Sequence, residues 1–407
     1  MMNMSNITTL LPVRVMKALA CVWLLVCATA CDSSDETALP EQPNKSMTVS
    51  ISIMTHKPAG TRAVQEYDRV GTVKENIIDV ANGDYRVLVF HKDGWLVKKF
   101  NEIKAEPDTD QNTNRYLICD SLDITMLDFS VVVLANWERN GWRYPLLAEG
   151  TTTIDGLMGD MKCLFTVRDR WQPLADDTDN TGGIPMFGMH RYSVSREDAL
   201  RSTMENPVKL AQTDKDIIWM VRSMAKIEVV DAMDKISKDD YPRLEKVTLS
   251  PCMAAGKLIP DAYSTGNSEP WSNGEQVNRT SLPAGITPTE RNLDFFATTD
   301  TDGKEGVENA ETYTGHTVYA AYVAEQDLTR NNGFLYITIR NRPDDMPGNG
   351  EATVTYSLDL SQDIGSKLLR NHIYRFEVKS ASAQLINVQY VVCPWIEPPA
   401  IDIPTFD

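Results

Sequence analysis

The chain has 407 residues, of which 42% are hydrophobic and 24% are charged, and its formal net charge at pH 7 is −17. This length allows two ordinary domains, and the composition is typical of a globular protein. The excess of acidic residues argues against nucleic acid as a partner, because phosphates are bound by basic surfaces. It also argues against binding of an anionic membrane surface through the charge of the protein.

The beginning of the chain is predicted to be a targeting segment. Arg14 and Lys17 precede a short apolar run, 18–28, which is followed by small residues and then by Cys31. This arrangement is typical of a secretory signal, and the run is too short for a membrane-spanning helix. Cys31 stands where a bacterial lipobox has its lipidated cysteine, although Ala28 replaces the usual Leu. An ordinary signal peptide with a chance cysteine is the alternative.

The folded part is expected to open with a strand that is followed directly by a loop. Residues 31–46 are acidic and polar and are interpreted as a flexible tether. Alternation of apolar and polar residues then predicts a strand with one buried and one solvated face; its apolar positions are Met47, Val49, Ile51 and Ile53. Pro58 and Gly60 end this pattern and predict a loop that contains Arg62. A cut in this loop would separate the strand from the rest of the chain.

Further strands are predicted along the first half of the chain. Two β-rich runs flank Asp93 and Gly94 within residues 85–100, which is a strong hairpin signal. Phe129–Ala135 is almost wholly apolar, and we expect it to lie in the middle of a sheet. A polar loop with an acidic cluster is expected over residues 171–183.

The second half of the chain is also predicted to be rich in strands. Ile217–Val230 fits either a helix or a strand, and its β-branched end favours a strand whose earlier part is bent or bulged. Short β-rich runs follow, with turn residues between them, at 244–249, 318–323, 334–340, 352–358, 374–378 and 385–392. Many short strands and few helical periods predict an all-β fold of the sandwich class. The last 15 residues contain four prolines and cannot form a central strand throughout.

The sequence lacks the common motifs of catalysis and of nucleotide binding. The five histidines are isolated, and the cysteines of the folded part are too far apart to resemble a zinc site. Two disulfides among Cys119, Cys163, Cys252 and Cys393 are possible, and buried free thiols are the simpler interpretation. We therefore expect no enzymatic activity, no cofactor and no metal.

Two features could bind a ligand, but each has a simpler explanation. Trp137, Trp142, Trp171 and Trp271 could line a sugar site, and packing in the core explains most of them. The aspartates within 176–179 lack the fixed Gly and terminal Glu of an EF-hand, so a solvated loop is the better interpretation.

Several of these pieces, taken together, resemble the fimbrillin superfamily of Bacteroidales, the subunits of type V pili. They follow one another in the family's order across nearly the whole mature chain. They are the lipobox at Cys31, the early strand followed by Thr61-Arg62-Ala63, the hairpin Asp84–Phe100, the strand Val132–Trp137, the segments Ile184–Gly188 and Arg222–Val229, and Tyr374–Val378 with the later Pro394-Trp395. The resemblance implies two transthyretin-like β-sandwich domains in series. We expect a signal peptide at 1–30, one domain at 47–215, and a second at 216–407 with a Pro-rich tail.

The resemblance also implies a route of assembly. Such subunits are exported as outer membrane lipoproteins, cut by an arginine-specific protease in the loop after the first strand, and joined at the cell surface by strand exchange. Arg62 matches the cleavage position, and Arg69 is the substitute. The strand that would be displaced carries Met47, Val49, Ile51 and Ile53. The candidate donor strand carries Ile386, Val388, Tyr390 and Val392 on one face. An exposed apolar sheet edge accepts such a strand readily.

Three functions remain open from the sequence, because one fold can host many functions. The favoured one is a structural pilus subunit, stalk or tip, that supports adhesion and has other pilus subunits as partners. The second is an uncut, lipid-retained pilus anchor or surface adhesin. The remote third is a carbohydrate-active β-sandwich protein.

Overall fold

The computed structural model describes most of the chain after the predicted tether. The described residues are 46–55, 75, 77–106, 115–160, 163–173, 182–213, 216–235, 240–259, 290–299, 317–328, 333–343, 352–364, 367–382 and 384–394. All of them belong to one compact unit, Asn44–Asp407. The predicted signal peptide and tether, Cys31, the cleavage candidates Arg62 and Arg69, and the Pro-rich tail lie outside the described residues.

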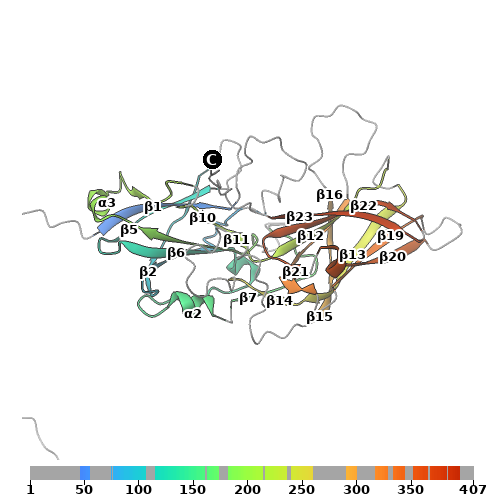
Figure 1. Ribbon diagram of the computed structural model, residues 1–407, viewed down its shortest axis with the longest axis horizontal. Helices are drawn as coiled ribbons and strands as arrows, with labels where there is room; N and C mark the ends of the chain where they lie inside the picture. The colour runs from blue at the N-terminus through green and yellow to red at the C-terminus, as the bar shows by residue number, and fades with distance from the viewer. Residues whose placement is uncertain are drawn as a thin grey trace, which may run out of the picture. The chain divides into compact units, whose positions relative to one another are not determined.

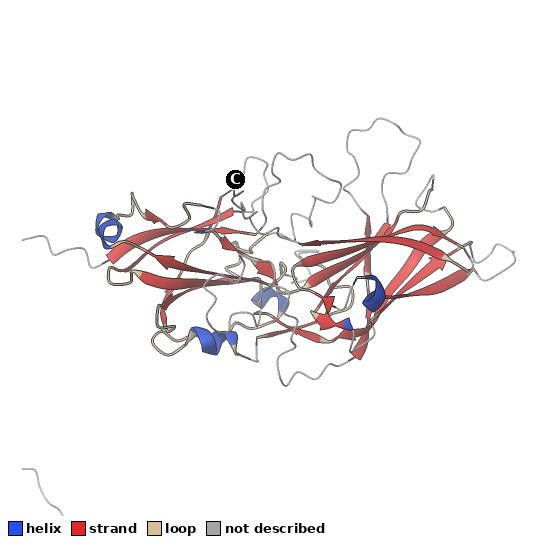
Figure 2. Cartoon of the chain, viewed as in Figure 1, coloured by secondary structure: helices blue, strands red, loops and turns tan. Residues whose placement is uncertain are grey.

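Strands account for almost all of the regular structure, which confirms the prediction of an all-β fold (Figures 1 and 2). In the described part of the chain, the helices are short elements between strands. They are α2 (Ile154–Met158), α3 (Arg196–Arg201), α5 (Leu360–Asp363) and a 3-10 turn, Glu138–Asn140.

The first pair of sheets encloses a core built from strands of the N-terminal half. One sheet has the order β10-β1-β5-β4, with β9 also beside β1, and the other has the order β11-β8-β6-β2-β3. Side chains from both sheets, such as Met47 and Val131, share one apolar cluster. The strands are β1 (Ser46–Met54), β2 (Tyr85–His91), β3 (Leu96–Phe100), β4 (Lys104–Glu106), β5 (Arg115–Asp123), β6 (Asp128–Ala135), β8 (Met186–Ser193), β9 (Val208–Lys209), β10 (Ile218–Trp219) and β11 (Val221–Arg222).

The second pair of sheets is built from the C-terminal half and encloses another core, to which Ile227 and Val247 belong. The sheets have the orders β16-β17-β12-β22-β23 and β15-β13-β19-β20. Their strands are β12 (Ala225–Asp231), β13 (Arg243–Met253), β15 (Glu290–Asp294), β16 (Phe296–Thr299), β17 (Thr317–Val323), β19 (Phe334–Arg340), β20 (Thr353–Asp359), β22 (His372–Ala381) and β23 (Ile386–Pro394). Two small sheets pair β7 (Leu164–Thr166) with β14 (Ala255–Lys257) and β18 (Gln326–Asp327) with β21 (Lys367–Leu368).

The predicted central strand lies in the middle of its sheet. β6 has β2 on one side and β8 on the other. Its side chains alternate between two apolar clusters: Val131 and Val133 belong to the core of the first pair of sheets, and Val132 and Leu134 to the larger cluster. Burial on both faces explains why this strand is almost wholly apolar. The hairpin prediction is also confirmed, since β2 pairs antiparallel with β3.

The β-branched end of the stretch Ile217–Val230 forms a strand, as predicted, but the whole stretch is not one bulged strand. It forms β10, β11 and β12, which belong to three different sheets. The backbone N–H of Met220 donates to the carbonyl of Met54, and that of Ser223 donates to the carbonyl of Pro185, so each bonds a distant segment. β10 and β11 follow the predicted boundary at 216 in sequence, but they pair with strands of the first half. The division into domains at 47–215 and 216–407 stays a prediction.

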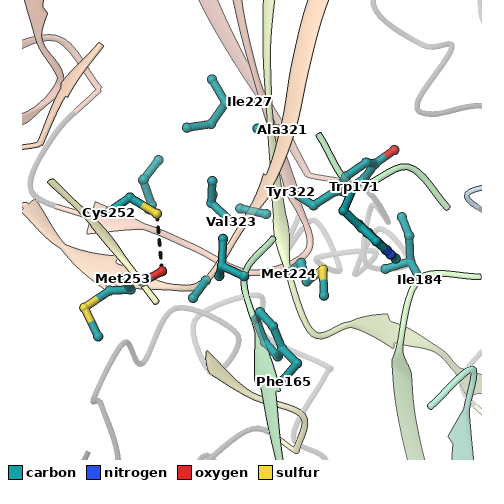
Figure 3. Packing of buried hydrophobic residues seen from close by; sticks show 14 of the residues in the cluster. Phe165, Trp171, Ile184, Met224, Ile227, Cys252, Met253, Ala321, Tyr322 and Val323 are labelled. Carbon is teal, nitrogen blue, oxygen red and sulfur yellow. Dashed lines mark hydrogen bonds between the residues drawn. The ribbon is translucent and has the colours of Figure 1, made fainter. Parts of the chain in front are cut away.

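One apolar cluster contains residues from both halves of the chain (Figure 3). The rings of Trp171 and Tyr322 meet edge to face with centroids 5.0 Å apart. Trp137 and Trp142 are buried in the same cluster, as core packing predicts. These three tryptophans therefore form no exposed sugar-binding surface, and Trp271 lies outside the described residues.

Candidate functional site: the first strand and its anchors

β1 has hydrogen-bonded neighbours along both edges. It pairs antiparallel with β5 over its whole length, from Ser46 opposite Asp123 to Met54 opposite Arg115. On the other edge, two short strands pair with it in parallel, β9 at Val49 and β10 at its C-terminal end. The first strand is therefore part of the interior of its sheet.

The four apolar side chains of β1 form part of the core. Met47, Val49, Ile51 and Ile53 each have 0% of their surface exposed, so the predicted buried face is confirmed. They share a cluster with side chains of β5 and of the opposite sheet, among them Ile118, Val89, Phe129 and Val131. Removal of β1 would uncover these apolar groups and one edge of β5.

The prediction that the opposite face of β1 is solvated is wrong, because other segments cover it. Thr48 and Ser52 are both buried. The backbone N–H of Thr48 donates to Oγ of Ser202, directly after α3, over 3.0 Å. Arg115 on β5 donates to Oγ of Ser52 over 3.3 Å. Thr48 and Ser52 are thus polar residues under cover and Ser50 is partly exposed, and alternation in sequence cannot distinguish covered polar residues from a wet surface.

Arg222 holds the chain on both sides of the segment that contains Arg62. Its side chain is 0% exposed. Nη2 donates to the carbonyl of Thr55, at the end of β1, and Nε donates to the carbonyl of Glu75, each over 3.2 Å. Its backbone N–H and Nη1 both donate to Oδ1 of Asn371, over 3.2 and 3.4 Å. One buried guanidinium therefore links the end of β1 to the point where the described chain resumes.

Further charged groups surround Glu75. Nζ of Lys226 lies 2.6 Å from Glu75 Oε1 and 2.5 Å from Glu228 Oε1. The hydroxyl of Tyr322 donates to the same Glu75 carboxylate. These residues, together with Arg222, are called the Glu75 cluster.

The protonation states in the Glu75 cluster follow from burial and charge. Burial lowers the pKa of Arg222 to about 9, against the opposing effects of Glu75 and Tyr322, so the guanidinium stays charged at neutral pH. Burial also disfavours the charge of Lys226, but Glu228 and Glu75 outweigh it and raise the lysine pKa. Burial, and then the Glu75 charge, raise the pKa of Tyr322, so its hydroxyl remains a donor.

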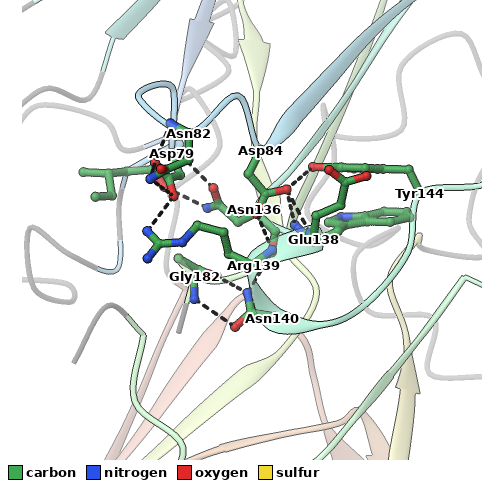
Figure 4. Close-up of polar contacts among 12 residues, drawn as sticks. Asp79, Asn82, Asp84, Asn136, Glu138, Arg139, Asn140, Tyr144 and Gly182 are labelled. Atoms are coloured by element: carbon green, nitrogen blue, oxygen red, sulfur yellow. Dashed lines mark hydrogen bonds and ion pairs between the residues drawn. The ribbon is translucent and has the colours of Figure 1, made fainter. Parts of the chain in front are cut away.

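A second polar network, which the sequence analysis did not predict, fixes the chain after residue 76 (Figure 4). The carboxylate of Asp84 accepts hydrogen bonds from the backbone N–H groups of the turn at 137–139 and from the Tyr144 hydroxyl. The Asn136 side chain donates to the carbonyls of Ile77 and Ile184. Segments that carry the family resemblance, around residues 84, 136 and 184, therefore meet in one place. The signal in the sequence that could have pointed to this network is the presence of Asp84 and Asn136 directly beside apolar strand runs.

The candidate donor strand, β23, is paired within its own chain. It lies at the end of its sheet and pairs antiparallel with β22. Ile386 and Val388 pack partly buried against the core, whereas Tyr390 and Val392 are 48% and 37% exposed. The four residues thus lie together on an edge strand, and their donation to a second subunit stays a prediction.

Other candidate sites of the sequence can be placed only in part. Cys119, Cys163 and Cys252 are free thiols, of which Cys119 is exposed, and the Cys393 side chain lies outside the description. Within the described residues, no group of three or more His, Cys, Asp or Glu side chains is placed to hold a metal ion. None of the helices in the described part of the chain is long and apolar enough to cross a membrane.

Comparison with known proteins gives matches among solved structures. No protein-family model and no curated protein matches the chain. The chain is similar to the tip fimbrial protein Mfa3 from Porphyromonas gingivalis with a C-terminal truncation, at 14% sequence identity over 86% of this chain and 100% of that chain, with a TM-score of 0.47. It is also similar to a fimbrial assembly protein from Parabacteroides distasonis, at 13% identity over 85% of this chain and 95% of that chain, with a TM-score of 0.42.

Further similar structures, from Parabacteroides distasonis and Bacteroides uniformis, are described as candidate cell adhesion proteins. Sequence identity to these four structures is at most 14%, and their TM-scores are all below 0.5. At this level of identity, the similarity concerns the fold.

Proposed function

We propose that the protein is a structural subunit, stalk or tip, of a cell-surface pilus that supports adhesion. It is exported to the outer membrane as a lipoprotein through Cys31, cut after Arg62 by an arginine-specific protease, and polymerised by exchange of β1. Its partners are other pilus subunits, and we assign it no catalytic role. The observation that carries the proposal is β1 itself, a strand whose four core side chains are fully buried and which leads directly into the segment with Arg62.

The burial of β1 explains why the uncut subunit would stay monomeric. Its four core side chains contribute roughly 1.5–3 kcal/mol each, or roughly 6–12 kcal/mol in total. Ordering of the strand opposes this term. While β1 is part of the same chain, its high effective concentration favours its own groove over any competing segment. A cut after Arg62 removes that advantage, and a segment of another subunit can then compete.

The groove left by β1 would suit an extended segment with the same alternation. Without β1, β5 would present an unpaired edge from Arg115 to Asp123, beside the uncovered core. Backbone hydrogen bonds along this edge would supply affinity, and the pockets for alternate side chains would supply specificity. β23 carries apolar side chains on alternate positions, Ile386, Val388, Tyr390 and Val392, and remains the candidate donor.

Replacement of Arg62 tests the proposal. We expect the Arg62→Ala protein to remain an uncut, lipidated monomer at the cell surface and to enter filaments at less than about a tenth of the wild-type amount. Arg69→Ala is the matched control and should assemble normally. Immunoblots of sheared filaments and of outer membranes measure both pools. If Arg62→Ala and the double variant assemble as well as wild type without a cut, the subunit is an uncut anchor and the proposal is wrong.

A further inference from the structure

The contacts of Arg222 bear on whether β1 stays in place after the chain is cut. The inference drawn from them rests on the proposed function. Any cut between residues 56 and 74 leaves Thr55 on the fragment with β1 and Glu75 on the body of the protein. Arg222 donates to the backbone carbonyls of both residues. The link between fragment and body through this side chain therefore survives a cut anywhere in the segment.

Arg222 is itself held firmly on the body. Its strand, β11, pairs with β8 at Met186 opposite Arg222. Oδ1 of Asn371 accepts from its backbone and from its side chain. Asn371 has a positive φ of 57° and its own N–H donates to the carbonyl of Met224, so its position is fixed by the backbone. The guanidinium thus occupies one defined position at the end of the β1 groove.

The departure of β1 would leave this charge without one of its acceptors. The guanidinium is fully buried and charged, and a hydrogen bond from a charged donor is stronger than one between neutral groups. A buried charged group that loses a partner carries the cost of its desolvation. Loss of the Thr55 carbonyl is therefore disfavoured until another acceptor, from water or from an incoming chain, reaches Nη2.

We propose that Arg222 is a latch that retains the β1 fragment after cleavage, so that the cut alone does not empty the groove. Exchange then requires an incoming strand that displaces β1 and presents a backbone carbonyl at the position of the Thr55 carbonyl. The latch would keep the apolar groove covered between cleavage and assembly. Arg222 acts here by positioning and retaining a strand, through its fixed fork of donors.

The test separates the latch from the natural cleavage. A recognition sequence for a site-specific protease is placed within residues 56–74, and the purified protein is nicked completely in solution. Release of the β1 fragment is then followed over time by size-exclusion chromatography with mass detection. We expect the nicked wild-type protein to retain the fragment, and Arg222→Met to release it at least tenfold faster. Because the nick is introduced, the result does not depend on whether Arg62 is cut in the cell.

Two further variants exclude a general loss of stability. Arg139→Met is the matched control, because Arg139 pairs with Asp79 over 3.0 Å and both residues lie on the body of the protein. This variant should release the β1 fragment at the wild-type rate. Asn371→Gly suits the positive φ and removes the acceptor that orients Arg222. We expect this variant to release the β1 fragment about threefold faster than wild type. Its result decides the question if Arg222→Met does not fold. Equal release from wild type and Asn371→Gly, or equal acceleration by Arg139→Met and Arg222→Met, would overturn the latch.

Discussion

At the scale of single residues, burial disfavours the ionisation of two thiols and one phenol in the core. Burial raises the pKa of the Cys163 and Cys252 thiols from 9.0 to about 12, and that of the Tyr116 hydroxyl from 10.0 to about 12. All three groups are neutral in the folded protein at neutral pH. In the unfolded chain, they would ionise at lower pH.

These shifts predict a loss of stability in alkali. A group with a raised folded-state pKa contributes stability that is complete below its unfolded pKa and is lost as the pH rises to its folded pKa. For Cys163 and Cys252, the window runs from about pH 9 to 12, because in this range the unfolded chain releases the thiol protons that the folded protein retains. Burial lowers the pKa of Arg222 to about 9, so the contribution of this residue to stability rises with pH above that value. This rise offsets the loss from one such thiol.

Urea unfolding at pH 8 and pH 10.5 measures the effect. We expect the free energy of unfolding to fall by several kcal/mol between these two values. A double variant, Cys163→Ala with Cys252→Ala, is less stable at pH 8. Its free energy of unfolding should fall less steeply with pH, because its unfolding releases roughly two fewer protons. A free energy that is flat or rises over this range would show that these groups are not buried as described.

At the scale of elements, β6 is the central strand of its sheet and is buried on both faces. Val132 is 0% exposed and lies opposite Leu88 on β2 and Met189 on β8. Val132→Asp would place an unpaired charge in the larger apolar cluster. We expect it to reduce the free energy of unfolding by several kcal/mol, roughly the cost of such a charge after relaxation.

The exposed edge of β23 supplies the control for that prediction. Val392 is 37% exposed, so Val392→Asp should change the free energy of unfolding of the monomer by less than about 0.5 kcal/mol. Chemical unfolding of both variants measures the difference. If Val132→Asp unfolds at the same urea concentration as wild type, β6 is not the buried central strand.

The strands that could be predicted from the sequence are those that a local sequence pattern specifies. The alternation of β1, the apolar run of β6 and the turn between β2 and β3 each specify their element locally. The stretch from Ile217 to Val230 could not be divided correctly, because its three strands are separated only by where Met220 and Ser223 find distant carbonyls. The cover over Thr48 and Ser52 was also unpredictable, since it comes from segments more than 60 residues away.

At the scale of the whole molecule, the proposed exchange site depends on residues from distant parts of the sequence. Arg222 and Asn371 lie far along the chain from Thr55, yet they meet at the end of the β1 groove. Alternation in the sequence predicted β1, and a family resemblance pointed to Arg62 as the cleavage position. Neither gave any sign that a buried arginine would connect the two sides of the predicted cut, because a lone arginine has no periodic pattern.

N-terminal sequencing of the protein recovered from cell-surface filaments tests the central claim most directly. Cleavage and strand exchange predict that the assembled protein begins at Ala63, or at Val70 if the cut falls after Arg69. In either case, β1 would be absent from the covalent chain of the assembled subunit. Assembled protein with a blocked, lipid-bearing N-terminus at Cys31 would contradict cleavage and would identify the subunit as an uncut anchor.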